Sequence, residues 1–479
     1  MPGARPRARP MARRFHTRLA TTAAACVAAL MAACGGGGGG GGGGGIVPGV
    51  ACSATNQKNF VLSAARQWYL FLETLPTTVD VSNYATTQEL LDALTATARA
   101  EGRDRFFSHV TTPQADSSFL SEGEFIGFGF RSRIESNRLL VPDVYEGSPA
   151  AQGGLARGAE ITHVDSGSGF VPIATILATD PNLEQAFGPA TAGVQRGLRF
   201  VLAGGQQLQA TFTKAVVTIP PVPAGSTSIF ALPSNPSVSV GYVNLRTFIS
   251  TAETPLRNAY ANFRAQGIQY FIVDLRYNGG GLVSIADTIG DLHGRDRSAL
   301  DVWSNMRFNA SQSSSNSVRR FISQPQSVDP VRIAFITTGG TASASELVIN
   351  SLKPWVEVAI VGSDTFGKPV GQSAFDLAGC DLRLRLVTFR TTNADDEGDY
   401  YDGLAETLPF ACAAGDDLTR APWDSAESST AAALSWLGTG ACGQLMSAPL
   451  TPLQKAQAGF RTPLARVPGP AQAYLPGLF

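Results

Sequence analysis

Apolar residues recur at helical spacing in two stretches near the start of the chain. Phe60, Ala64 and Trp68 follow the period of an amphipathic helix within 56–72, and residues 87–99 repeat the pattern. The sequence therefore predicts a small helical N-terminal region, which we place at 51–115.

Further along, the pattern changes to short apolar runs separated by turn residues. From residue 124 to about 214 the runs are brief and alternating, as in a β-rich domain. After a Pro-rich stretch near 220–223, apolar strands are expected at 238–245, 270–275, 331–336 and 356–361. Helical segments at 252–266 and 282–292 fall between them, and this alternation predicts an α/β layered core. The polar, Ser-rich residues 304–326 are expected to form a mobile loop beside the site.

Length and charge limit the classes of protein that the chain can be. With 479 residues, it is too long for one core and predicts two or three folded units. Its formal net charge of −1 gives no electrostatic reason to expect nucleic acid or an anionic membrane surface as a partner.

The first 34 residues have the pattern of an export signal. Arginines precede a short apolar stretch at 19–33 that ends in small residues before Cys34. The stretch is too short for a transmembrane helix. Cys34 after two alanines resembles a bacterial lipoprotein box, so we expect lipidation there; the alternative is ordinary cleavage near Ala33. Residues 35–50, which contain an unbroken glycine run, are expected to form a flexible tether or a plain spacer.

Four cysteines remain after this leader, namely Cys52, Cys380, Cys412 and Cys442. An exported protein meets oxidising conditions, so the even number predicts two disulfides, whose pairing the sequence leaves open. The spacings form no zinc-binding pattern, and no metal site is expected.

Two segments carry candidate chemistry. Ser343 and Lys368 each follow one of the expected buried strands, at 331–336 and 356–361. A serine hydroxyl is a poor nucleophile unless a base takes its proton, and an uncharged lysine can be that base. Thr341 and Ser345 are rival hydroxyls whose ordinary role would be helix capping. A solvated lysine or an ion pair with Asp364 is the structural alternative for Lys368.

These segments resemble those of the carboxy-terminal processing, or tail-specific, serine peptidases, which use a Ser/Lys dyad. The similarity is tight over 241–372 and looser over 123–214, with departures at Thr338 and Pro369. It implies that Ser343 is the nucleophile, Lys368 the general base and Gln372 a residue that holds the lysine or the substrate. Backbone N–H groups of Ala344 and of either Gly279 or Gly280 are the expected oxyanion donors.

Residues 124–164 resemble a PDZ domain of the bacterial protease type. The loop consisting of Gly127, Phe128, Gly129 and Phe130 would expose N–H groups to a substrate carboxylate, and the adjoining strand would accept an extended peptide. The family core is related to the crotonase type. We therefore expect a multidomain α/β protein: signal at 1–34, tether at 35–50, helical region at 51–115, PDZ-like domain at 116–218, Ser/Lys peptidase domain at 219–440 and a tail at 441–479.

The predicted function is an exported serine endopeptidase of the bacterial cell envelope. It would be periplasmic, held to a membrane only through its lipid anchor, and would cut proteins or peptides near their free C-termini without a cofactor. One alternative is a catalytically silent PDZ-bearing lipoprotein that binds peptides, and a weaker one is a crotonase-like acyl-transfer or ligand-binding protein. A Ser-His-Asp triad would need His109, His163 or His293, none of which lies in a motif that places it beside Ser343.

Overall fold

The computed structural model describes residues 52–442, 460–461, 470–475 and 477–479. The expected signal, Cys34 and the glycine tether lie outside these residues. Within the described part of the chain, no helix combines the length and apolarity that a membrane crossing requires.

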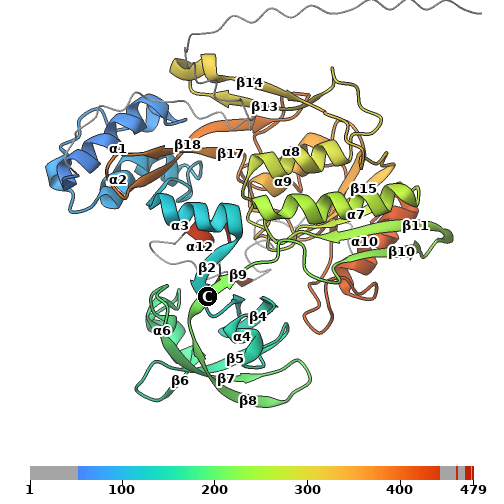
Figure 1. Cartoon of the computed structure of the whole chain (residues 1–479), viewed down its shortest axis with the longest axis horizontal. Helices are drawn as coiled ribbons and strands as arrows, with labels where there is room; N and C mark the ends of the chain where they lie inside the picture. Colours follow the sequence, from blue (N-terminus) through green and yellow to red (C-terminus); the bar gives the residue numbers. More distant parts are fainter. Residues whose placement is uncertain (1–51, 443–459, 462–469, 476) are drawn as a thin grey trace, which may run out of the picture. The chain divides into compact units, whose positions relative to one another are not determined.

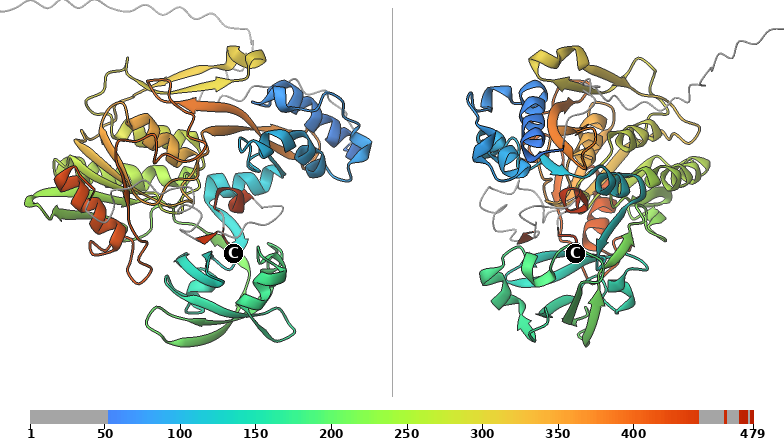
Figure 2. Two further views of the ribbon diagram at one scale, coloured as in Figure 1. Left: turned by 180° about the vertical axis from the view of Figure 1, so that it is seen from behind. Right: turned by 60° about the vertical axis from the view of Figure 1, so that its left-hand side comes forward.

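The N-terminal region is helical, as predicted. It contains α1 (Ala54–Trp68) and α2 (Thr87–Ala100), whose first turns are capped by the side chains of Ser53 and Thr86. The apolar faces of both helices pack on Leu384 and Leu386 of β18 (Arg383–Thr392). Figure 2 shows these blue helices beside the orange strands from two sides. A disulfide between Cys52 and Cys380 joins the start of this region to the turn before β18.

The β-rich, PDZ-like domain is also present. Its sheet runs in the order β20-β3-β4-β5-β7-β8. The strands are β20 (Phe460–Arg461), β3 (Phe130–Glu135), β4 (Arg138–Val144), β5 (Glu160–Asp165), β7 (Gln195–Val201) and β8 (Gln207–Thr213). The strands that enter and leave the domain, β2 (Glu124–Gly127) and β9 (Ala215–Thr218), pair antiparallel with each other.

The core of the third unit is a six-stranded sheet of order β10-β11-β12-β15-β16-β19. Figure 1 labels β10, β11 and β15 of this sheet, near α7 and α10. The strands are β10 (Thr227–Leu232), β11 (Asn235–Asn244), β12 (Tyr270–Asp274), β15 (Arg332–Thr337), β16 (Glu357–Gly362) and β19 (Ala411–Ala413). All neighbours pair in parallel except β10 and β11. The α/β prediction is confirmed.

Helices cover both faces of this sheet. Successive side chains of a strand point to opposite faces, so each face carries apolar residues that a helix layer buries. Phe271 and Val273 of β12 pack in the cluster with α7 (Glu253–Ala265), α8 (Val283–Leu292) and α9 (Ala344–Leu352). Ile272, between them, packs in the cluster with α10 (Ser428–Thr439) on the other face. Cys412 of β19 forms a disulfide with Cys442.

A second sheet lies beside the site and corrects one expectation. It has the order β1-β18-β13-β14, where β1 is His109–Thr111, and β17 (Val370–Asp376) also pairs with β18. Its strands β13 (Val302–Phe308) and β14 (Ser317–Arg320) form an antiparallel pair within the segment predicted to be a mobile loop. An outer strand can keep polar side chains on its solvent face, so a Ser-rich composition did not exclude strand structure.

The topology brings three loops to one edge of the main sheet. Parallel strands β12, β15 and β16 all end there, and the loops 275–282, 338–343 and 363–369 follow them. In open α/β sheets, ligands bind at the carboxyl ends of the strands. The two candidate catalytic side chains belong to two of these loops.

Candidate active site

Ser343 occupies a strained turn between β15 and α9. Its backbone has φ 57°, a conformation that non-glycine residues rarely adopt. Ser343 is half-buried, whereas the residues on either side of it, Ala342 and Ala344, are buried. A strained, partly accessible serine at a helix N-terminus is an arrangement often kept for function rather than for stability.

The rival hydroxyls are committed elsewhere. Thr341 Oγ1 donates to the Leu275 carbonyl at 2.8 Å and accepts from the Thr338 N–H. Ser345 Oγ donates to the Asn278 carbonyl at 2.9 Å. Both side chains are fully buried, so they fasten the loops to each other. Ser343 is the hydroxyl of the three that a substrate could reach.

Lys368 lies in a dry pocket between β16 and β17. It is only 5% exposed, and its ammonium lies 4.6 Å from the centre of the Phe107 ring. Burial lowers its pKa to about 8, against the opposing effect of the Asp104 and Glu346 carboxylates. Among the described residues, no ion pair within 4 Å involves Lys368; Asp364 instead accepts from the N–H groups of Thr365 and Ala405. The lysine is therefore ready to lose its proton close to neutral pH.

The N-terminal region builds one wall of this pocket. Lys368 Nζ donates to Gln372 Oε1 at 3.4 Å, and Gln372 Nε2 donates to the Phe107 carbonyl at 2.6 Å. Arg105 donates to the carbonyls of Phe366, at 2.8 Å, and Gly367. The loop that carries Lys368 is thus held by residues more than 250 positions earlier, a contribution that the sequence reasoning missed.

Glu346 joins the two halves of the candidate dyad. A single oxygen of its carboxylate accepts from the N–H of Ser343 at 2.9 Å and from the N–H of Lys368 at 2.8 Å. The other oxygen accepts from the Gly367 N–H at 2.6 Å. Glu346 is completely buried, and burial raises its pKa. Sequence reasoning assigned it no role, although a serine followed three residues later by a glutamate is the pattern of a capping box.

The glycine loop lies directly against the serine. A side-chain Cβ on Gly280 would come within 2.8 Å of Ser343 Cβ and 2.9 Å of the Ala344 nitrogen, and Gly280 has φ +101°. The Gly280 N–H donates to Asn278 Oδ1 at 2.9 Å. Within the described residues the Gly279 N–H donates no hydrogen bond. The structure therefore brings Gly280, Ser343 and Ala344 together, and the N–H of the neighbouring Gly279 donates no hydrogen bond among the described residues.

The histidines are placed as structural residues. His293 contacts the Tyr260 hydroxyl at 3.0 Å and the Ile289 carbonyl. His109 contacts the Phe107 carbonyl through Nδ1, and burial lowers its pKa to about 4. His163 lies in the PDZ-like sheet beside Thr162. None of these described contacts reaches Ser343.

The predicted peptide-binding loop faces a segment of the same chain. The N–H groups of Gly129 and Phe130 both donate to the Phe479 carbonyl oxygen, at 2.8 and 3.2 Å. Phe128 and Phe130 are completely buried in the domain core. Gly127 has no room for a side chain, because the Phe125 ring and the Phe479 backbone lie against it.

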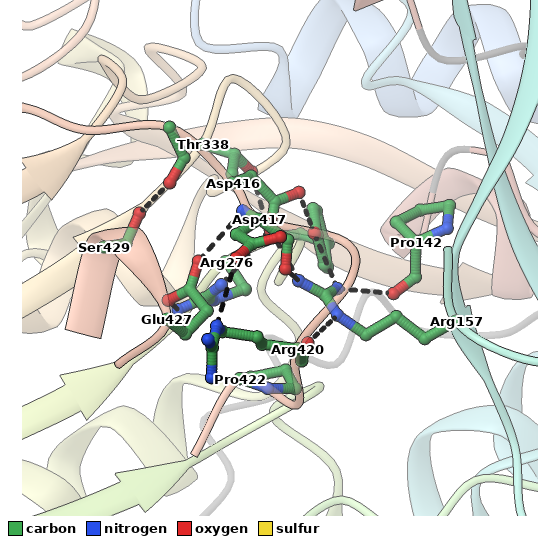
Figure 3. A network of polar contacts seen from close by, with 12 residues as sticks. Pro142, Arg157, Arg276, Thr338, Asp416, Asp417, Arg420, Pro422, Glu427 and Ser429 are labelled. Carbon is green, nitrogen blue, oxygen red and sulfur yellow. Dashed lines mark hydrogen bonds and ion pairs between the residues drawn. The ribbon is translucent and has the colours of Figure 1, made fainter. Parts of the chain in front are cut away.

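A charged network joins the PDZ-like domain to the peptidase core (Figure 3). Asp416 accepts from Arg133 at 2.8 Å and Arg157 at 2.7 Å, both of the PDZ-like domain, and from Arg276 at 3.2 Å and Tyr277 of the core. Burial alone would raise the pKa of Asp416, but the three arginines lower it to about 2. Because Arg276 and Tyr277 precede the glycine loop, the network connects the PDZ-like domain to the site.

Comparisons with known proteins agree with these features. Residues 239–403 match the sequence profile of peptidase family S41, and residues 56–109 match the S41 N-terminal domain. A carboxyl-terminal-processing protease of Synechocystis is 27% identical over 61% of this chain and 65% of its own length. The chloroplastic carboxyl-terminal-processing peptidase 2 of Arabidopsis thaliana is 26% identical over 56% of this chain and 49% of its own length. The match thus spans 65% and 49% of the lengths of these two curated relatives.

The fold also matches a solved structure. A crystal structure of a protein described as an S41 protease from Bacteroides fragilis superposes with a TM-score of 0.60. It covers 80% of this chain and 97% of its own, at 21% identity. At that identity the likeness concerns the fold.

Proposed function

Since the chain belongs to peptidase family S41, we propose that it is a serine endopeptidase that cuts protein substrates near their C-termini with a Ser343/Lys368 dyad. One observation carries this proposal: a buried lysine with a lowered pKa and a strained, half-buried serine are anchored on the same oxygen of Glu346. Export to a bacterial envelope and lipidation of Cys34 belong to the same proposal and rest on the sequence of the leader.

The chemistry follows from the groups at the site. Ser343 Oγ attacks the carbonyl carbon of the scissile bond while neutral Lys368 Nζ takes its proton. The N–H groups of Gly279 and Ala344 stabilise the negative charge that develops on the carbonyl oxygen. The protonated lysine then returns the proton to the leaving amine. A water molecule, deprotonated by Lys368, hydrolyses the ester that remains on Ser343.

The positioning residues have separate tasks. Gln372 keeps Lys368 Nζ in place and is itself held by the Phe107 carbonyl. The loop containing Gly127, Phe128, Gly129 and Phe130 binds the end of the substrate, with the Gly129 and Phe130 N–H groups as donors.

Hydrolysis of an unstructured reporter protein tests this function. Wild-type protein should cleave it, and Ser343→Ala and Lys368→Met should each lose at least a thousandfold in kcat/KM while remaining folded. Ser435→Ala is the matched control, because Ser435 is exposed on α10 and belongs to none of the three loops of the site. Equal cleavage by wild type and Ser343→Ala would refute the dyad. Binding of the reporter without turnover would favour the silent peptide-binding lipoprotein.

A further inference from the structure

Residues 477–479 fill the groove in which a substrate end would bind. Besides the two bonds to its carbonyl oxygen, Phe479 donates its own N–H to the Phe130 carbonyl at 3.0 Å. The Ser132 N–H donates to the Gly477 carbonyl at 2.8 Å, and Leu478 forms an antiparallel bridge with Arg131. This is strand addition to β3, the mode by which an extended peptide binds a sheet edge.

The Phe479 side chain occupies an aromatic pocket. Its ring centre lies 4.5 Å from that of Phe187 and 6.1 Å from that of Phe130, and the residue belongs to the buried core of the PDZ-like domain. Aromatic pairs at these distances add to the gain from burying apolar area. The groove is therefore filled in both its backbone and its side-chain positions.

The same segment covers the catalytic loops. Helix α12 (Pro470–Tyr474) places the Tyr474 carbonyl oxygen directly against Gly279, within 1.8 Å of where a Cβ on that residue would lie. The Tyr474 ring stacks on Phe119, 5.5 Å between centres, and lies 6.0 Å from Lys368 Nζ. Tyr474 and Leu475 are 4% and 0% exposed, so this contact is closely packed.

The segment does not present a cleavable bond. The Leu475 N–H donates to the Ala471 carbonyl at 2.7 Å, which keeps the stretch beside Gly279 helical rather than extended. Among the described residues, it makes no hydrogen bond to Ser343 or Lys368. It fills the space over the oxyanion loop without offering a carbonyl carbon to the serine in an extended strand.

We propose that residues 470–475 and 477–479 act as a self-bound inhibitor: Phe479 occupies the edge of β3 in the PDZ-like domain, α12 covers Gly279, and a substrate with a similar apolar-aromatic pair must displace both. This inference rests on the proposed function for its effect on activity, but the self-binding itself can be measured without catalysis. It also narrows the substrate class to chains that can place an aromatic or large apolar side chain against Phe187 in place of Phe479.

Binding is tested in the Ser343→Ala background. A fluorescein-labelled peptide of residues 472–479 should bind Ser343→Ala/Phe479→Asp at least tenfold more tightly than Ser343→Ala. In Ser343→Ala the protein's own Phe479 occupies the binding site, and the apparent affinity for the peptide is the intrinsic affinity multiplied by the fraction of molecules whose site is vacant. Equal affinities would overturn the proposal. If the Phe479 variant does not fold, the test is made instead by measuring hydrogen exchange in Ser343→Ala with and without the peptide. Exchange at 471–475 should accelerate when the peptide saturates the groove, and unchanged exchange would overturn the proposal.

Activity supplies the second readout. Phe479→Asp should hydrolyse a reporter protein severalfold faster than wild type, whereas Leu300→Asp, at a 79% exposed apolar residue, should not change the rate. Unchanged or lower activity in the folded Phe479 variant would contradict inhibition. If intact-mass measurements show that wild type loses residues 475–479 and Ser343→Ala keeps them, the segment is a substrate of the protein's own site and not an inhibitor. If every variant is inactive while the peptide affinities differ as expected, self-binding stands and the peptidase function fails.

Discussion

At the residue scale, the proposed dyad requires a lysine that is both buried and uncharged. Folding lowers the pKa of Lys368 from 10.5 to about 8, chiefly through burial. A shift of that size corresponds to roughly 3 kcal/mol of destabilisation while the lysine is protonated in both states. If Lys368 is the proposed base, its neutral form is obtained at the expense of stability.

Lys368→Met should consequently give an inactive but more stable protein. Below pH 8 both states of the wild type are protonated, and the folded state carries the full cost of a buried charge. Between pH 8 and 10.5 the folded state has lost the proton that the unfolded state keeps, so wild-type stability rises with pH through this window. Denaturant unfolding at pH 7 should show a gain of about 1–3 kcal/mol for the variant. If Lys368→Met is less stable than wild type, interactions of the Lys368 ammonium in the folded protein must outweigh the cost of burying its charge.

Glu346→Gln tests the anchor shared by the dyad. The amide keeps the shape but replaces charge-assisted acceptors with weaker ones, and it introduces an NH₂ toward backbone N–H groups. We expect kcat/KM to fall by about ten- to a hundredfold and the free energy of unfolding by about 1–3 kcal/mol. Asp399→Asn serves as the control, because Asp399 pairs with Arg390 at the surface. Full activity in Glu346→Gln would show that the dyad geometry is set elsewhere.

The residues of the proposed dyad could be identified from the sequence, but the residues that contact them from distant parts of the chain could not. Ser343, Lys368 and Gln372 lie in two short motifs, and the choice of Ser343 over its neighbours came from the family resemblance. Phe107 and Arg105 could not be found in this way, because no local pattern reports a contact across 250 residues or more. Glu346 could have been found from its capping-box spacing to Ser343.

At the element scale, the loop after β12 must pass within contact distance of the nucleophile turn. Gly280 makes this possible through a positive φ and the absence of a Cβ. The expected helices and strands of the main sheet fall within a few residues of the observed ones, because apolar periodicity reports burial directly. Strands β13 and β14 escaped prediction because their exposed faces are polar.

Gly280→Ala should therefore disable the site. The methyl group would meet Ser343 Cβ at 2.8 Å and the backbone conformation would be strained, so we expect at least a hundredfold loss in kcat/KM and about 1–3 kcal/mol of stability. Gly339→Ala is the matched control, since nothing lies within 4 Å of its added carbon and its φ is not positive. Equal rates for the two variants would exclude Gly280 from the contact with the nucleophile turn.

At the scale of the whole molecule, contacts between residues far apart in the sequence connect the three units to the candidate site. Arg105 and Phe107, which follow α2, pack beside Lys368 and its loop, and Asp416 joins the PDZ-like arginines to the loop that carries Gly279. The order of units could be predicted from the chain, but their junctions could not, because surface arginines and aspartates carry no signature of their partners. The packing of residues 470–475 and 477–479, within a segment expected to be a tail, was missed for the same reason.

Asp416→Asn probes the junction between the PDZ-like domain and the core. Removing the charge weakens three ion pairs to one buried carboxylate, although Arg276 keeps Asp274 and Glu427 and Arg133 keeps Glu135. Breaking a buried ion pair costs about 3–5 kcal/mol. We expect a correspondingly lower unfolding midpoint in urea. Asp424→Asn, at an exposed pair with Arg420, should unfold as wild type does. Identical unfolding of Asp416→Asn and wild type would mean that the network contributes nothing to stability.

The most direct test of the central claim is the rate at which a serine-directed phosphonofluoridate probe labels the protein across pH 6–10, with the modified residue mapped by mass spectrometry. If neutral Lys368 activates Ser343, labelling falls on Ser343, its rate rises with pH to a plateau with a midpoint near the pKa of about 8, and Lys368→Met abolishes it. Labelling of another residue, or of Ser343 at an undiminished rate in Lys368→Met, would contradict it.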